Sequence, residues 1–169
     1  MCLEDVVDKF IFKQTRIGFD GKPFTIYKIL TIEPGLENQR PTLKSRHDSC
    51  VRKGKMYRFL RAFGVDEFPQ IYNILKGEMA LVGPRPLTPE EDFKLPEDFS
   101  RERKKHKPGI IPPYYADLEA ALKDEINPED RIRTDWTYLK EKEIHPILTD
   151  IKCIGNTLYN FIVKGVRSF

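Results

Sequence analysis

Cysteine, histidine and long apolar runs are scarce in this sequence, and each scarcity excludes a class of protein. The 169 residues include three widely spaced cysteines, so we expect reduced thiols rather than a disulfide scaffold. No CxxC pair or Cys/His cluster occurs, so a zinc site is not expected, and we interpret the three histidines as surface or structural residues. No stretch approaches the roughly 18 apolar residues of a membrane-spanning helix, and the first residues do not resemble a signal peptide.

Apolar and charged residues are mixed in the proportions of a globular domain. Hydrophobic residues make up 40% and charged residues 33% of the chain, and its length suits a single domain over residues 1–169. Thirteen prolines predict enforced turns and short elements rather than a simple helical bundle.

Positive charge is concentrated in two segments, although the net charge is only +3. Residues 40–61 carry eight lysines and arginines against one acid, and residues 101–107 form a second basic run. Basic segments favour an anionic partner. Charge alone does not distinguish nucleic acid, anionic lipid and phosphorylated small molecules as that partner. A solvated surface is the alternative interpretation.

The pattern of apolar residues and turn signals predicts a small α+β fold. Residues 10–15 and 24–32 are expected to form a β-hairpin around Asp20-Gly21, and residues 80–82 a short strand. We expect helices over residues 55–63, from Asp66 to Gly77, over residues 100–106 and 128–144, and from Ile147 onward. The fold class is therefore a small hairpin or sheet with several short helices, amphipathic interfacial helices and proline-rich connections.

Two adjacent carboxylates, Asp66 and Glu67, stand at the start of an apolar helix. In one interpretation Asp66 is the N-cap and Glu67 a first-turn acid. In the other, the pair holds Mg²⁺ and one carboxylate attacks a phosphorus atom. Arg61 and Arg85, the latter between two prolines, could then bind phosphate oxygens.

One long run and several short ones resemble the bacterial sugar transferase family, the monotopic polyprenyl-phosphate phosphoglycosyl transferases. The long run is residues 66–86, DEFPQIYNILKGEMALVGPRP. The shorter matches are FKQTRIG (12–18), GKPF (21–24), IYK (26–28), FLR (59–61), KPGI (107–110) and LTDIK (148–152). The resemblance covers nearly the whole chain.

The resemblance implies a phosphoglycosyl transferase that initiates glycan or exopolysaccharide assembly. A sugar 1-phosphate would pass from a nucleotide-diphosphate sugar to a polyprenyl phosphate through a phosphosugar-aspartyl intermediate at Asp66. Glu67 would help Asp66 to hold the Mg²⁺ cofactor or would handle a proton. Lys28, Arg61 and Arg85 match basic positions of the family and are carried over as phosphate contacts; Arg16 also matches, with less reason to place it in the site.

Several positions depart from the family pattern. IPPYYAD (111–117) replaces a loop that supplies an arginine in the family, Leu30 replaces another arginine, and Glu78 replaces an aspartate. The alternative function is therefore a catalytically impaired relative that binds nucleotide sugar or scaffolds a glycan pathway. A nucleic-acid partner is not expected, because no aromatic-rich basic motif accompanies the charge.

Membrane contact is the other departure from the family. Family members begin with a hydrophobic helix that enters the membrane and turns back, whereas about ten residues precede the first expected strand here. We expect a fragment, a protein that uses interfacial helices, or a separate membrane-anchoring partner. The helix from Ile147 has one apolar face and suits either the headgroup layer or a packed core. The expected location is the cytoplasmic face of the cell membrane, peripheral or monotopic, with the chain itself soluble.

Overall fold

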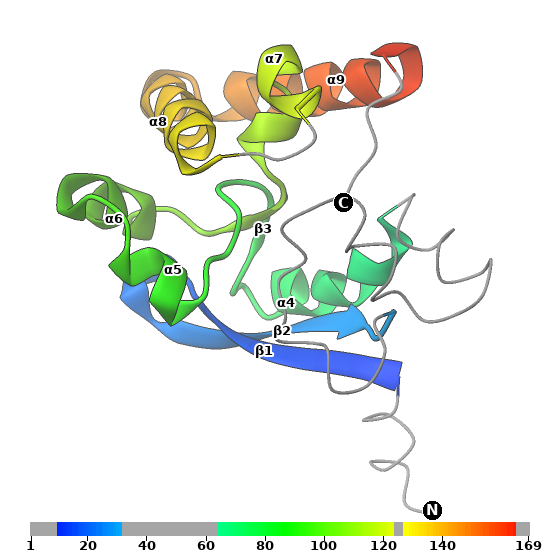
Figure 1. Ribbon diagram of the computed structural model, residues 1–169, viewed down its shortest axis with the longest axis vertical. Coiled ribbons are helices and arrows are strands. Elements are labelled where there is room, and N and C mark those ends of the chain that lie inside the picture. Colours follow the sequence, from blue (N-terminus) through cyan, green and yellow to red (C-terminus); the bar gives the residue numbers. More distant parts are fainter. Residues whose placement is uncertain (1–9, 32–63, 124–126, 165–169) are drawn as a thin grey trace, which may run out of the picture.

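The computed structural model describes residues 10–31, 64–123 and 127–164 (Figure 1). The predicted helix over residues 55–63 and both ends of the chain lie outside these ranges. The elements, in order, are β1 (Ile11–Ile17), η1 (Phe19–Gly21), β2 (Pro23–Ile29), η2 (Val65–Gln70), α4 (Ile71–Leu75), β3 (Ala80–Val82), α5 (Pro89–Phe93), α6 (Glu97–Lys104), β4 (Gly109–Ile111), η3 (Pro113–Tyr115), α7 (Leu118–Ala121), α8 (Pro128–Ile144) and α9 (Pro146–Lys164). This is a small α+β fold, as the sequence predicts.

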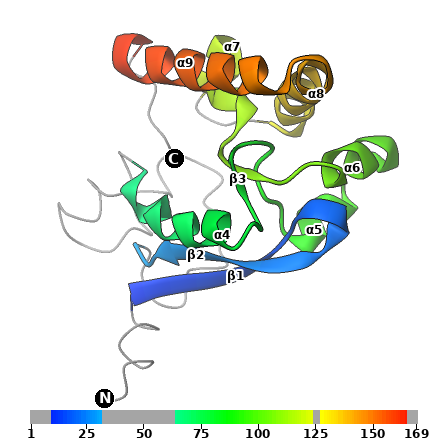
Figure 2. The ribbon, with the colours of Figure 1, turned by 180° about the vertical axis from the view of Figure 1, so that it is seen from behind.

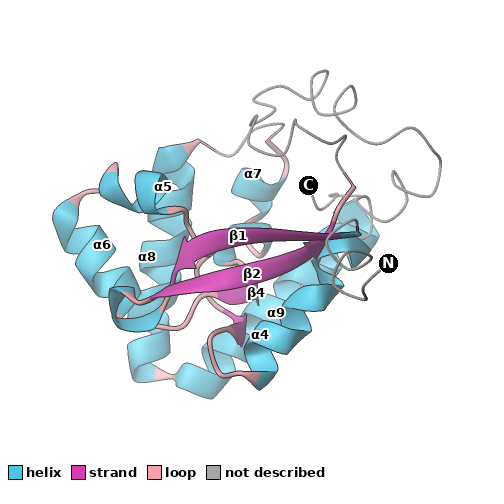
Figure 3. Cartoon of the chain, turned by 90° about the horizontal axis from the view of Figure 1, so that it is seen from below, coloured by secondary structure: helices cyan, strands magenta, loops and turns pink. Residues whose placement is uncertain are grey.

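Two short sheets lie between the helices. The hairpin β1–β2 forms one side of the molecule with α4 against it, and α7, α8 and α9 gather on the opposite side (Figures 1 and 2). Figure 3 shows the hairpin from below, with the short second sheet behind it. The parallel pair β3–β4 thus lies between the hairpin and the long helices.

The β-hairpin confirms the turn predicted at Asp20-Gly21. Asp20 and Gly21 have φ angles of 56° and 70°, a left-handed conformation that Asp and Gly adopt at little cost. The strands pair antiparallel, with Ile11 opposite Ile29 and Ile17 opposite Pro23. Strand β1 therefore ends two residues later than predicted, and β2 ends three residues earlier.

The segment after residue 64 begins differently from the prediction. Gly64, with φ 65°, is the N-cap of η2, and no side chain caps that end. Asp66 and Glu67 instead lie in the first turn of this 3₁₀ helix. The interpretation of Asp66 as an N-cap is therefore wrong, because Gly64 in left-handed conformation already turns the chain two residues earlier.

The parallel pair β3–β4 requires two glycines. Ala80 pairs with Gly109 and Val82 with Ile111. A Cβ atom on Gly109 would lie 2.1 Å from the backbone nitrogen of Gly83, so the two backbones approach too closely for any side chain. This contact holds the loop that carries Arg85 against the start of β4.

The core under the long helices joins β3 to α8 and α9. Val82, Tyr138, Leu139 and Cys153 pack together there. The Tyr138 hydroxyl lies 2.6 Å from Asp150 Oδ1, and Lys142 Nζ bonds the same carboxylate at 2.8 Å. Helix α8 has the predicted bounds, whereas α6 begins three residues before the predicted start and ends at Lys104.

Candidate active site

A pocket opens between the hairpin, η2 and the two proline-rich connections. It is a narrow hollow that is partly open to solvent. Its lining residues are Arg16, Ile26, Lys28, Glu67, Gln70, Arg85, Pro86, Gly109, Ile110 and Pro112. Three of the residues predicted as site residues, Lys28, Glu67 and Arg85, therefore meet in one place.

Lys28 on β2 and Glu67 on η2 form an ion pair in this pocket. Lys28 Nζ lies 2.5 Å from Glu67 Oε1, and the two side chains are only 19% and 22% exposed. Burial alone would raise the pKa of Glu67, but Lys28 and then Arg85 outweigh burial, so this pKa is lowered. Burial lowers the pKa of Lys28, which Glu67 only partly offsets and Arg85 reinforces. The Glu67 direction thus reflects one carboxylate placed beside two cations, whereas the Lys28 direction reflects burial of its ammonium.

Arg85 is held from both sides of its loop. Its Nη1 donates to the Tyr114 hydroxyl at 3.2 Å, and its carbonyl oxygen accepts from Arg103 Nη2 at 2.5 Å. Tyr114 raises the pKa of Arg85, and Glu67 adds to this against the effect of burial. The guanidinium is therefore a permanent positive charge with a fixed backbone, as a phosphate contact requires.

Asp66 is half-buried beside Glu67 but does not line the pocket. Burial lowers the Lys28 pKa, and the charge of Asp66 partly opposes that lowering, so this carboxylate lies within electrostatic reach of the cationic cluster. Arg61, the third predicted phosphate contact, lies outside the described residues.

Arg16 and Gln70 line the pocket although sequence reasoning did not place them there. Arg16 Nη1 donates to the Pro86 carbonyl at 3.2 Å and to Glu91 at 3.0 Å, so it joins β1 to the Arg85 loop and to α5. Strand register could have found Arg16, because Gln14 pairs with Ile26 and alternate residues of both strands then share one face with Lys28. No sequence signal singled out the buried Gln70.

The two carboxylates supply the kind of donor that Mg²⁺ takes. Mg²⁺ prefers oxygen ligands and is often bound by one or two carboxylates together with substrate phosphates. Asp66 and Glu67 are adjacent in η2, and the Glu67 oxygen Oε1 is engaged by Lys28. The carboxylate of Asp66 and the second oxygen of Glu67 are therefore of the ligand type that Mg²⁺ prefers.

A second feature is the exposed apolar face of α9. The side that packs on the protein is largely polar, with Thr149, Thr157 and Asn160 buried beside Cys153. The exposed large apolar residues on α9 and at the end of α8 are Ile144, Ile147, Leu148, Ile151, Leu158, Tyr159, Ile162 and Val163. This face is exposed from the first turn onward, whereas Ile154 and Phe161, predicted on it, are partly buried.

Among the described residues, no helix combines the length and the apolar character needed to cross a bilayer. The side of α9 opposite its apolar face carries polar residues, so the helix is amphipathic rather than apolar all round.

Comparison with known proteins agrees with the resemblance noted in the sequence. The family model described as bacterial sugar transferase matches residues 2–164. The uncharacterized sugar transferase EpsL of Bacillus subtilis is 42% identical over 101 residues, 59% of this chain and 46% of that protein. The galactosyl transferase CpsE of Streptococcus agalactiae is 34% identical over 158 residues, 88% of this chain and 33% of that protein.

A third relative is the UDP-glucose:undecaprenyl-phosphate glucose-1-phosphate transferase of Klebsiella pneumoniae. It is 36% identical over 159 residues, which are 92% of this chain and 33% of the relative. The chain thus spans between a third and a half of the length of these curated relatives. Because the family model covers nearly every residue, including the pocket and the exposed helix, this chain belongs to the bacterial sugar transferase family.

Proposed function

We propose that this chain transfers a sugar 1-phosphate from a nucleotide-diphosphate sugar to a polyprenyl phosphate. The observation that carries the proposal is the pocket in which Lys28 and Arg85 surround the Glu67 carboxylate beside Asp66. A diphosphate needs cations around it, and phosphoryl transfer needs alignment and neutralised charge more than covalent chemistry from the protein. The Klebsiella relative carries UDP-glucose and undecaprenyl phosphate in its name, which supports this substrate class.

The reaction proceeds in two displacements at one phosphorus. A carboxylate oxygen of Asp66 bonds the sugar-bearing phosphorus, and the bond to the nucleoside monophosphate breaks, so that group leaves with the electron pair. An oxygen of the polyprenyl phosphate then bonds the same phosphorus and releases the Asp66 carboxylate. The product is a polyprenyl-diphosphate sugar, and this step would initiate glycan assembly.

The surrounding residues bind the phosphate groups and position the cations around them. Arg85 binds phosphate oxygens with a guanidinium whose backbone is fixed by Arg103. Glu67 orients Lys28 toward the same space through their ion pair. Asp66 and Glu67 would hold Mg²⁺, which neutralises charge on the diphosphate when bound.

A binding protein without transferase activity is the second candidate, and one observation favours it. Tyr114 belongs to the segment that departs from the family pattern, and its hydroxyl already accepts from Arg85 Nη1 at 3.2 Å. A hydroxyl that engages this guanidinium would compete with the phosphate for it, which would slow transfer.

The apolar face of α9 supports a position at a membrane surface. A helix that buries threonine and asparagine and exposes isoleucine and leucine has the opposite arrangement to a core helix in water. In the headgroup layer the same apolar side chains are withdrawn from water. We place the protein at the cytoplasmic face, where a nucleotide sugar would be its donor.

Incubation with radiolabelled nucleotide sugars tests the enzymatic proposal. The chain is mixed with Mg²⁺, detergent-solubilised undecaprenyl phosphate and each labelled sugar in turn, and lipid-linked label is counted. We expect product from the wild type and from the control Asp98→Asn, an exposed acid of α6, and none from Asp66→Asn. Without acceptor, intact-protein mass should show a phosphosugar adduct that Asp66→Asn lacks. Product from Asp66→Asn contradicts the covalent route, and binding without product from any sugar supports the second candidate.

A further inference from the structure

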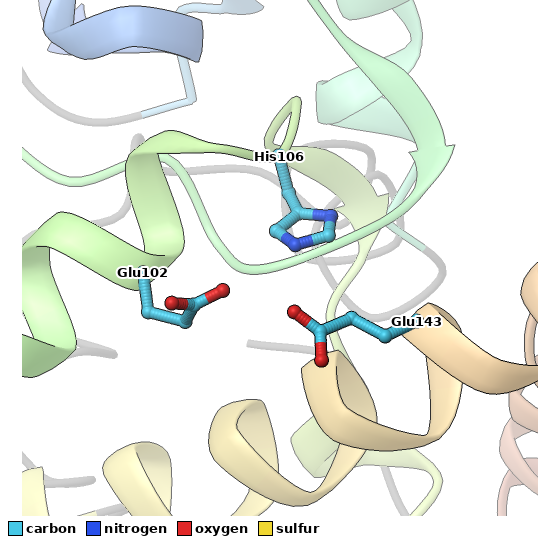
Figure 4. A group of neighbouring side chains, drawn as sticks. All are labelled: Glu102, His106 and Glu143. Atoms are coloured by element: carbon cyan, nitrogen blue, oxygen red, sulfur yellow. The ribbon is translucent and has the colours of Figure 1, made fainter.

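Three potential metal ligands converge outside the candidate active site. Glu102 lies on α6, His106 follows the end of that helix, and Glu143 lies in the last turn of α8. One ligand atom from each residue lies within 4.8 Å of the other two. Figure 4 shows the two carboxylates and the imidazole facing the space between them.

The charges around this group leave one oxygen of Glu102 without a cationic partner. Glu102 Oε2 accepts from Lys105 Nζ at 2.7 Å. Glu102 Oε1 is buried and accepts no hydrogen bond from a nitrogen donor in the described part of the chain, and the carboxyl group of Glu143 is near enough to share a proton with Glu102. An unpaired buried carboxylate oxygen costs free energy, and a second carboxylate nearby adds repulsion.

The lysine that precedes Glu143 on α8 does not supply the missing charge. Lys142 Nζ is bonded to both oxygens of Asp150, at 2.8 and 3.0 Å, and to the Tyr138 hydroxyl at 2.7 Å. Lys142 is therefore directed toward α9 rather than toward Glu143. A bound cation would contact both glutamates and would satisfy the orphaned oxygen of Glu102.

The imidazole nitrogen of His106 favours Zn²⁺ over Mg²⁺ or Ca²⁺. Mg²⁺ and Ca²⁺ prefer sites made of oxygen, whereas one nitrogen and two carboxylates suit Zn²⁺, with water as a fourth ligand. Zinc bonds of about 2.0–2.1 Å place tetrahedral ligands roughly 3.4 Å apart. Ligand atoms that lie within 4.8 Å of one another need only a small closure to reach this spacing, which the exposed side chain of Glu143 can provide by rotation.

We propose that Glu102, His106 and Glu143 form a Zn²⁺ site that joins the end of α6 to the last turn of α8. The site shares no residue with the candidate active site. It lies close in sequence to the pocket, because Gly109 and Ile110 of β4 line that pocket three and four residues after His106. Its role is to stabilise the segment that leads from α6 into β4.

Zinc titration of the tag-free, chelator-treated full chain tests the site. Calorimetry should give one Zn²⁺ per chain, with affinity reduced at least tenfold in His106→Gln and in Glu143→Gln. The matched controls are His145→Gln and Glu129→Gln, which change an exposed histidine and an exposed glutamate outside the cluster. Glu67→Gln should also bind normally, which separates this site from the dyad.

The melting temperature and the absorption spectrum with Co²⁺ provide two further tests of the site. Zn²⁺ should raise the melting temperature of the wild type and controls but not of the cluster variants. Co²⁺ in place of Zn²⁺ should give visible absorption bands of a nitrogen and oxygen site, without the charge-transfer band of a thiolate. No binding, equal binding in all variants, or a thiolate band that survives His106→Gln would each overturn the proposal.

Discussion

Lys28 and Glu67, 39 positions apart, join the hairpin to helix η2 through an ion pair of 2.5 Å. Glu67 therefore has two tasks in the pocket, to hold the ammonium in place and to lower the local positive charge. Removing one partner of a largely buried ion pair destabilises the protein by more than the pair contributes in total to its stability. The reason is that the other charge stays buried without a counter-charge.

Substitution of Glu67 by glutamine should separate positioning from nucleophilic attack. The amide keeps the size of the side chain but loses the charge that orients Lys28, so product formation should fall about tenfold to a hundredfold. The phosphosugar adduct at Asp66 should still form, only more slowly. Rapid-quench measurement of adduct and product checks this, with Glu129→Gln as an exposed control; an unchanged rate would show that the pair is dispensable.

Arg85→Lys tests the need for a planar, paired contact to phosphate. Lysine keeps the charge but cannot make two parallel hydrogen bonds, so transfer should fall about tenfold or more while the fold is retained. Tyr114→Phe provides the companion variant, because it removes only the hydroxyl that accepts from Arg85. If Tyr114 restrains the guanidinium, Tyr114→Phe should transfer faster than the wild type; a slower rate would instead make the hydroxyl a support for Arg85.

Charged residues on the exposed face of α9 should abolish membrane association. Ile151→Glu with Leu158→Glu places two carboxylates on that face, and each would have to enter the headgroup layer. Flotation with liposomes that contain anionic lipid should recover the wild type and lose the double variant. Phe93→Glu is the matched control, because Phe93 is 91% exposed on α5, away from α9 (Figure 1). Equal flotation of both variants would show that α9 does not contact the bilayer.

A methyl group at Gly109 should destabilise the fold. Its Cβ would collide with the backbone of Gly83, which has no flexible end to move aside, and we expect a loss of about 2–4 kcal/mol in the free energy of unfolding. Gly155→Ala in α9 is the control, because nothing lies within 4 Å of its Cβ and alanine favours helix by about 1 kcal/mol. Urea denaturation of both variants measures the difference; equal stability would mean that β3 and β4 can separate without cost.

Asp135 should make stability depend on pH. Burial raises its pKa to about 6, although Arg103 lies 3.3 Å away and opposes the rise. Because the folded pKa exceeds the unfolded value of 3.8, the stabilisation is complete below pH 3.8 and is lost as the pH rises through 6. Denaturation at pH 4 and pH 7 should therefore show a loss of about 1–3 kcal/mol that Asp135→Asn lacks. A pH dependence that Asp135→Asn shares with the wild type would contradict this assignment.

Local patterns in the sequence were sufficient for part of the fold. The Asp20-Gly21 turn and the β-branched residues on both sides predict the hairpin, and the bounds of α8 follow from Pro128 and the apolar spacing up to Ile144. The run from Asp66 to Pro86 is by itself long enough to indicate the family of the chain. These features depend on neighbours in the chain, so propensity and spacing reveal them.

Contacts between distant residues needed the tertiary structure. Only the folded chain brings Lys28 to Glu67, places Arg16 in the pocket, and gathers Glu102 and His106 around Glu143. It also decides which face of α9 packs on the core, since periodicity finds an apolar face but not the direction in which it points. The physical reason is that these distances depend on loop closure and on the packing of β3 against β4, for which no local segment of sequence holds the information.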